Sequence, residues 1–135
     1  MKTGMLHLHH YLPYLFLMVL LISILRSYLG KIENPKTDKL LLVTLILAHF
    51  QLIIGFYLLF PFPEVEMGVI MKDAVIRFKF VEHPLLMLIS VILITIGKSK
   101  SKKITDIKKA NKLIFGYFII AFILIIMTIP WDQIF

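Results

Sequence analysis

The sequence contains no cysteine among its 135 residues. This absence excludes disulfide bonds, iron–sulfur clusters, thiolate ligation of haem and covalent attachment of a c-type haem. The chain also has no glycine-rich phosphate loop, no Ser/His/Asp arrangement and no paired carboxylates inside an apolar run. It therefore offers no candidate residues for hydrolysis or phosphoryl transfer.

Charge is scarce as well, at 17% of residues, whereas 59% are hydrophobic and the mean hydropathy is +0.90. Such a composition calls for a search for apolar runs of about 20 residues, the length that crosses a bilayer as a helix. Four runs emerge, joined by short connections. They predict an all-α integral membrane protein, an up-and-down bundle of four transmembrane helices in one domain, residues 1–135. The expected helices are 9–29, 40–60, 74–97 and 113–130.

The third predicted helix must begin well before Pro84 if it is to span a membrane. From Pro84 to Gly97 a helix covers only about 20 Å, which is too short to span. We therefore expect it to begin near Met71 to Ala74 and to bend at Pro84, where a backbone donor is missing.

The first apolar run has a second interpretation. Because Lys2 precedes it, the run resembles a secretory signal. No small-residue cleavage pattern follows Ser23, however, and the run is long, so a spanning helix is favoured.

Basic residues are distributed unevenly between the connections. Lys and Arg near helix ends are retained on the cytoplasmic side, so the sequence predicts both termini on the non-cytoplasmic side of a bacterial inner membrane. The net charge of +7 then reflects contact with anionic lipid rather than binding of nucleic acid. Eleven of the fifteen basic residues flank the first or fill the third connection: Arg26, Lys31, Lys36, Lys39, Lys98, Lys100, Lys102, Lys103, Lys108, Lys109 and Lys112.

Five histidines stand out against this apolar background. An ionisable ring in hydrocarbon is costly, so it usually faces a bundle interior and has a function there. With cysteine absent, ligation of a non-covalent haem is the leading hypothesis, and His9, His49 and His83 are its main candidates. His7 is a weaker candidate as a terminal residue, and His10, which points about 100° away from His9, is expected at the interface.

Depth along the helices indicates which histidines can share one cofactor. Measured from the cytoplasmic ends at about 1.5 Å per residue, His83 lies about 20 Å up, His9 about 25 Å and His49 about 15 Å. His9 and His83 match best, and they lie on the first and third helices, which are diagonal in an up-and-down bundle. Since predicted helix ends are uncertain by two to four residues, a His49–His83 pair stays open.

Two further sets of residues fit a haem site but have simpler explanations. Arg77 and Lys79 precede His83 and offer cations for haem propionates, although basic residues also anchor a membrane edge. A small, partly polar stripe on the second helix favours close packing against another helix. The stripe consists of Thr44, Ala48, Gln51 and Gly55.

Short motifs along the whole chain resemble a family of short bacterial four-helix membrane proteins described as cytochrome b-like. The resemblance implies a b-type haem and membrane electron transfer, with His9, His49 and His83 as ligands and His7 as a further candidate. The motifs are Thr3-Gly4-Met5-Leu6-His7-Leu8-His9, Tyr11-Leu12-Pro13-Tyr14, Leu47-Ala48-His49-Phe50-Gln51, Arg77 with Val81-Glu82-His83-Pro84, and Ile96-Gly97-Lys98-Ser99-Lys100.

Two other classes of function remain open. The histidines, with Glu82, could bind copper, zinc or iron without a porphyrin, which requires three or more side chains to converge on one ion. Alternatively the chain is a small accessory subunit of a larger respiratory complex. The sequence decides neither an enzymatic reaction nor a redox partner, and a quinone site near Tyr14 and Trp131 is not specified by any spacing.

Overall fold

The computed structural model describes residues 2–59 and 66–129. Throughout these residues the chain is helical or in turns and connections, with no strand, as the sequence predicts. Four helical stretches are long and apolar enough to cross a membrane: Thr3–Tyr28, Lys39–Leu59, Ala74–Ser101 and Ile107–Thr128. The elements are α1 (Lys2–Tyr28), α2 (Lys39–Leu59), α3 (Met67–Lys72), α4 (Ala74–Arg77), a π-helix η1 (Phe78–Glu82), α5 (His83–Ser101) and α6 (Ile107–Thr128).

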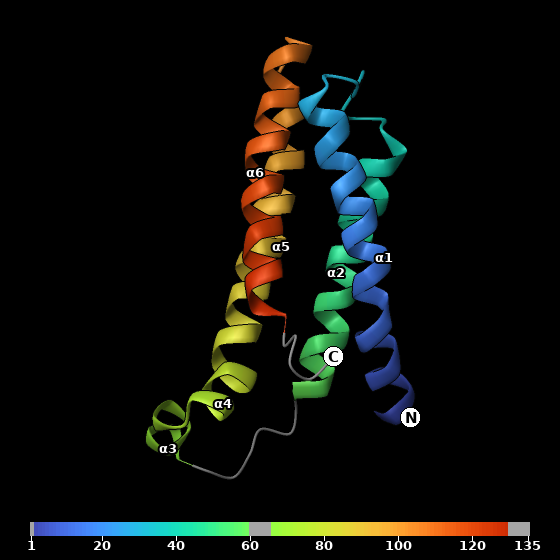
Figure 1. The fold of residues 1–135 in the computed structure, drawn as a ribbon. Helices are drawn as coiled ribbons and strands as arrows, with labels where there is room; N and C mark the ends of the chain where they lie inside the picture. The colour runs from blue at the N-terminus through green and yellow to red at the C-terminus, as the bar shows by residue number, and fades with distance from the viewer. Residues whose placement is uncertain (1, 60–65, 130–135) are drawn as a thin grey trace.

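The four long helices run up and down beside one another (Figure 1). α1 packs against α2 and α6, and α5 packs against the same two helices. α1 and α5 therefore occupy opposite corners of the bundle, the diagonal placement that the sequence predicts for the first and third helices.

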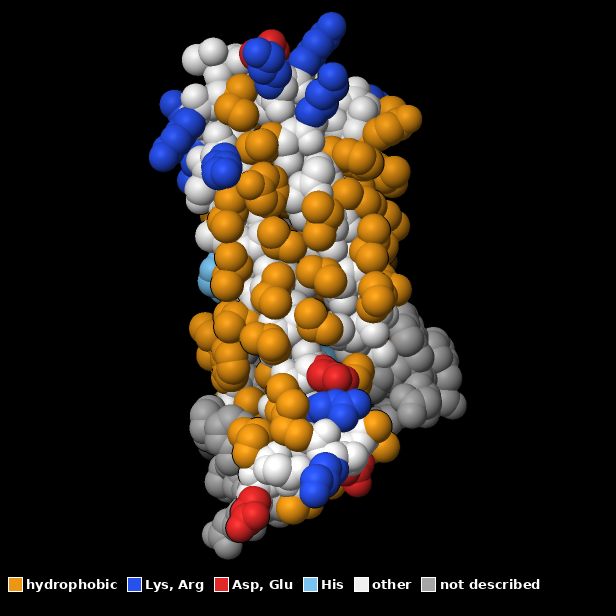
Figure 2. Space-filling view, turned by 90° about the vertical axis from the view of Figure 1, so that its left-hand side faces the viewer, with side chains coloured by type: hydrophobic (Ala, Val, Ile, Leu, Met, Phe, Trp, Pro, Cys, Tyr) orange, Lys and Arg blue, Asp and Glu red, His pale blue; other side chains and the backbone are white. Residues whose placement is uncertain are grey.

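The two ends of the bundle differ in composition. At one end lie the connections 29–38 and 102–106 with the lysines around them, which we call the lysine end. Figure 2 shows Lys and Arg side chains gathered there, above a broad belt of hydrophobic side chains. At the other end α1 and α5 begin and α2 and α6 finish, and we call it the histidine end.

Two helices begin earlier than their apolar runs. α1 starts at Lys2 rather than at residue 9, and α6 starts at Ile107 rather than at residue 113. The side chain of Asp106 accepts a hydrogen bond from the backbone N–H of Lys108 at 3.0 Å and caps α6. Hydropathy marks the stretch that suits a bilayer, whereas a helix begins where its first N–H groups find a partner. The expected last residues of the second and fourth helices, 60 and 130, lie outside the described residues.

The third spanning stretch begins at Ala74, within the predicted range. The carboxylate of Asp73 caps it by accepting hydrogen bonds from the backbone N–H groups of Val75 and Ile76. The regular α pattern is then interrupted just before Pro84, where η1 forms and the N–H of His83 bonds to the carbonyl of Phe78. A proline leaves a carbonyl of the preceding turn without a donor, and a π-turn is one way to accommodate that loss.

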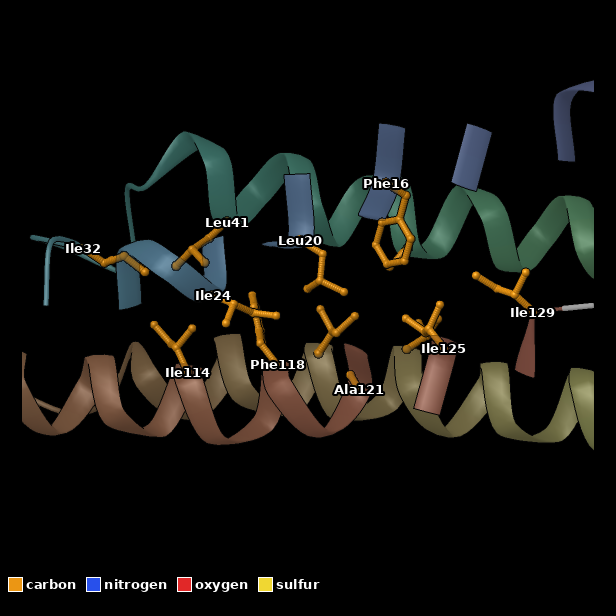
Figure 3. Packing of buried hydrophobic residues seen from close by; sticks show 13 residues of the cluster. Phe16, Leu20, Ile24, Ile32, Leu41, Ile114, Phe118, Ala121, Ile125 and Ile129 are labelled. Carbon is orange, nitrogen blue, oxygen red and sulfur yellow. The ribbon is translucent and has the colours of Figure 1, made fainter. Parts of the chain in front are cut away.

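The core is a single cluster of buried aliphatic and aromatic side chains between the helix pairs (Figure 3). Leu20, Leu41, Ile94, Ile114 and Phe118 are fully buried in it. Lipid tails are as apolar as these side chains, so in a bilayer close van der Waals packing holds the helices together.

At the histidine end, α6 and α2 still bury side chains, among them Ile125, Thr128 and Ile54. No residue of α1 from position 3 to 15 is buried, and none of α5 from 83 to 89. The side chains that face inward there, His9 and His83 among them, are only partly covered by their neighbours. At this end the starts of α1 and α5 are thus less covered than the end of α6.

Candidate functional site

His9 of α1 and His83 of α5 face each other across the histidine end. Their ring centroids are 6.4 Å apart and their planes are nearly perpendicular, at 89°. Both residues are half-buried. The structure thus brings together, from opposite corners of the bundle, the two histidines that match best in depth.

The ring of His83 is oriented by the end of α6. Its Nδ1 lies 2.7 Å from the backbone carbonyl oxygen of Thr128, the last residue of that helix. The last carbonyls of a helix have no partner within it, so this carbonyl is free to accept from the imidazole. The ring of Phe78 packs nearby, with centroids 6.0 Å apart.

The ring of His9 is oriented by α2. The side-chain amide nitrogen of Gln51 lies 3.0 Å from His9 Nδ1 and also 3.0 Å from the backbone carbonyl oxygen of His9. One turn further along α2, Gly55 leaves room for the ring, since a Cβ there would lie 3.2 Å from His9 Cε1. Gln51 and Gly55 thus hold His9 between them.

These two residues belong to the stripe on α2 that the sequence predicts to pack closely. The prediction is confirmed, because Thr44 and Ala48 are fully buried. The hydroxyl groups of Thr44 and Ser23 of α1 are hydrogen-bonded at 3.1 Å. One stripe thus joins α2 to α1 and ends beside His9.

The other histidines have different surroundings. His49 is exposed, and its Nδ1 donates to the carbonyl of Leu45 in its own helix at 2.8 Å. His7 is exposed and stacks on Tyr11, and His10 is exposed, as expected for an interfacial residue. In residues 2–59 and 66–129, no group of three His, Asp or Glu side chains could hold a metal ion. Neither His49 nor His7 therefore joins the pair in the three-ligand site that a non-haem metal requires.

Arg77 and Lys79, the predicted partners of haem propionates, both contact other groups of the protein. Arg77 donates to Glu82 at 3.1 Å and to the carbonyl of Met71 at 2.8 Å. The carboxylate of Glu82 thus forms an ion pair with Arg77, which lies five residues before it in the chain. Lys79 is exposed, and its ammonium lies 5.4 Å from the ring centroid of Phe80. Their role toward a haem stays a prediction.

Sequence reasoning missed Gln51 and Thr128 as partners of the two histidines. A signal for Gln51 was present, because Pro13 comes four residues after His9 and deprives the His9 carbonyl of its usual helical donor. Thr128 acts through its backbone, so its side-chain type carries no signal. Of the two aromatics considered for a quinone site, Tyr14 is exposed and Trp131 lies outside the described residues.

The site is a pair of inward-facing imidazoles at one end of an apolar bundle, each ring held at Nδ1 by a neighbouring helix. Comparison of the chain with protein-family models, curated proteins and solved structures finds no match.

Proposed function

We propose that the protein is a membrane b-type haem protein that transfers electrons, with His9 and His83 as axial ligands. The observation that carries the proposal is the 6.4 Å separation of the two rings. Two metal–imidazole bonds of about 2 Å each, together with the two ring radii, come to roughly 6 Å. The separation therefore suits one metal atom between the rings.

The surroundings of the pair are compatible with a haem. His83 donates from Nδ1 to a carbonyl, the usual arrangement for an imidazole that ligates through Nε2. Along α1 and α5 the side chains near the pair are only partly covered, unlike those of the core. When bound, a haem with two histidine ligands supplies a one-electron couple and has no open position for oxygen, which favours electron transfer over oxygen activation.

The proposal includes the location of the protein. It is a multi-pass protein of the bacterial inner membrane, with both termini on the non-cytoplasmic side and the lysine end against anionic lipid. Its redox partner is a quinone or a subunit of a respiratory complex, reached from the histidine end. The resemblance to the cytochrome b-like family agrees with this proposal.

The test is a reduced-minus-oxidised absorbance spectrum of detergent-purified protein, with haem quantified as pyridine haemochrome. We expect a b-type spectrum that is lost in His83→Ala and lost or shifted to a single-ligand form in His9→Ala. His49→Ala is the matched control, because His49 bonds within its own helix, and it should keep the spectrum. Absence of pigment after haem-supplemented expression would refute the haem, and loss in His49→Ala alone would refute the ligand pair.

A further inference from the structure

A proline in α1 determines how Gln51 is oriented. In an α-helix the carbonyl of residue 9 accepts a hydrogen bond from the N–H of residue 13, but Pro13 has no N–H. The amide nitrogen of Gln51 supplies the missing donor from α2, at 3.0 Å. Because a carbonyl only accepts, the amide must present its nitrogen, and not its oxygen, to His9.

This orientation decides the tautomer of His9. The same amide nitrogen lies 3.0 Å from His9 Nδ1. An amide nitrogen only donates, so Nδ1 must accept, and the neutral ring carries its proton on Nε2.

His83 is held the opposite way. Its Nδ1 faces the carbonyl of Thr128, which only accepts. Nδ1 therefore carries the proton, and Nε2 keeps a free lone pair. The two imidazoles of the pair are in different tautomers, although both are half-buried and face each other.

We infer that Gln51 is a positioning residue that makes the two histidines unequal: His83 is ready to bind a metal through Nε2, whereas His9 binds only after the Gln51 amide turns over. The part that concerns a metal rests on the proposed haem function. The part that concerns the tautomers stands on hydrogen bonding alone.

When the side-chain amide of Gln51 is turned over, its oxygen can accept a hydrogen bond from His9. Gln51 Oε1 is buried and has no hydrogen-bond partner among the described residues. After a half-turn of the amide, this oxygen accepts from a proton on His9 Nδ1. The proton leaves Nε2 for Nδ1 by exchange with water, so the charge of the ring is unchanged and Nε2 gains the lone pair that a ligand needs. The His9 carbonyl loses its donor in exchange.

The tautomers can be measured on the haem-free protein. Long-range ¹H–¹⁵N correlation spectra of the imidazoles distinguish protonated from unprotonated nitrogens, and single His→Ala variants assign each ring. We expect the proton on Nε2 in His9 and on Nδ1 in His83. A proton on Nδ1 of His9 would overturn the inference.

Two variants test the cause. Pro13→Ala restores a helical donor to the His9 carbonyl and frees the amide, so the Nδ1–H form of His9 should increase. Gln51→Glu places a carboxylate, which only accepts, beside Nδ1 and should make that form predominant. Pro35→Ala, in the connection at the lysine end, is the matched proline control and should leave both rings as they are. If neither Pro13→Ala nor Gln51→Glu changes the ring of His9, Gln51 does not control its tautomer.

A second readout uses haem-loaded protein. A carboxylate partner makes an imidazole ligand more basic, so Gln51→Glu should raise the low-spin fraction and lower the midpoint potential relative to the unmodified protein. If no haem binds but the tautomers are unequal as inferred, the proposed function fails and the role of Gln51 toward His9 stands. If haem binds and neither the low-spin fraction nor the midpoint potential changes in Gln51→Glu, the inferred control of ligation fails while the haem proposal survives.

Discussion

Gly55 has only a hydrogen atom as its side chain, and this leaves the space in which the ring of His9 lies. A Cβ at this position would lie 3.2 Å from His9 Cε1, closer than side chains normally pack. The ring must then move by a few tenths of an ångström, and its bond to Gln51 must lengthen or bend. A small side chain at one position on α2 thus determines where an imidazole of α1 lies.

Gly55→Ala should therefore lower the low-spin fraction of the haem-loaded protein without unfolding it. Alanine is the better helix former by about 1 kcal/mol, so the fold should not suffer. The spin state is measured by absorbance and by electron paramagnetic resonance. Gly116→Ala is the control, because a Cβ there meets nothing within 4 Å. Equal spectra from the two variants would contradict a steric role for Gly55.

Between elements, Asn111 of α6 secures the connection that joins α1 to α2. Its side chain accepts from the N–H of Ile32 at 3.2 Å and donates to the carbonyl of Ile32 at 2.9 Å and to that of Ile107 at 2.8 Å. Asn111 is 2% exposed and Ile32 is fully buried. One amide thus satisfies both backbone groups of a residue that water does not reach.

Asn111→Ala should destabilise the protein by about 1–3 kcal/mol, because it leaves the buried N–H and carbonyl of Ile32 unpaired. Thermal unfolding in detergent measures the loss, and hydrogen exchange should show faster exchange of the Ile32 amide. Asn111→Asp keeps the acceptor and loses the donor, so it should protect that amide better than alanine does. An unchanged unfolding temperature in Asn111→Ala would show that the connection is held by packing alone.

A salt bridge that responds to pH joins the last turn of α1 to the end of the same connection. Arg26 donates to both carboxylate oxygens of Asp38, with Nη1 3.0 Å from Oδ1. The hydrogen bond from Arg26 lowers the pKa of Asp38 below its ordinary value, against the opposing effect of burial. Because the pKa is lower in the folded state, the bridge stabilises the protein fully above the ordinary carboxyl pKa of about 4 and is lost as the pH falls through the folded-state value.

We therefore expect the unfolding temperature to fall as the pH is lowered below about 4. Asp38→Asn should cost about 1 kcal/mol at pH 7, since one partner of the bridge is part-exposed. The difference between this variant and the unmodified protein should shrink at acid pH, where both lack the charge. A difference that is constant between pH 7 and pH 3 would exclude the bridge as its source.

For the whole molecule, the proposed orientation depends on the gathering of basic side chains at the lysine end. Eleven of fifteen basic residues flank or fill the connections there, and such residues stay on the cytoplasmic side. The chain has no natural cysteine, so single cysteines can report on each end without background.

Thr3→Cys, at the histidine end, should react with a membrane-impermeant maleimide in intact spheroplasts. Lys103→Cys, at the lysine end, should react only after permeabilisation. Both positions are exposed, so access depends on the membrane alone. The reverse pattern of labelling would overturn the proposed orientation.

The helices could be predicted from the sequence because the forces that specify them are local. Apolar runs of spanning length mark the helices, and Pro84 interrupts one of them within a few residues of its own position. The helix starts were predicted less well: α1 begins at Lys2, and α6 begins at Ile107, where the cap by Asp106 and not hydropathy sets the start. The diagonal placement of α1 and α5 followed from short connections in an up-and-down bundle.

The candidate site could be predicted from the sequence only in part. The sequence by itself made the histidines conspicuous and, through the rise per residue, matched His9 and His83 in depth. It left a His49–His83 pair open, because rotation about the helix axis depends on which face each neighbour covers. Only the tertiary structure turned His49 outward, brought His9 within 6.4 Å of His83 and placed Gln51 and the Thr128 carbonyl at their rings. Contacts between helices depend on packing over the whole bundle, and no local pattern encodes them.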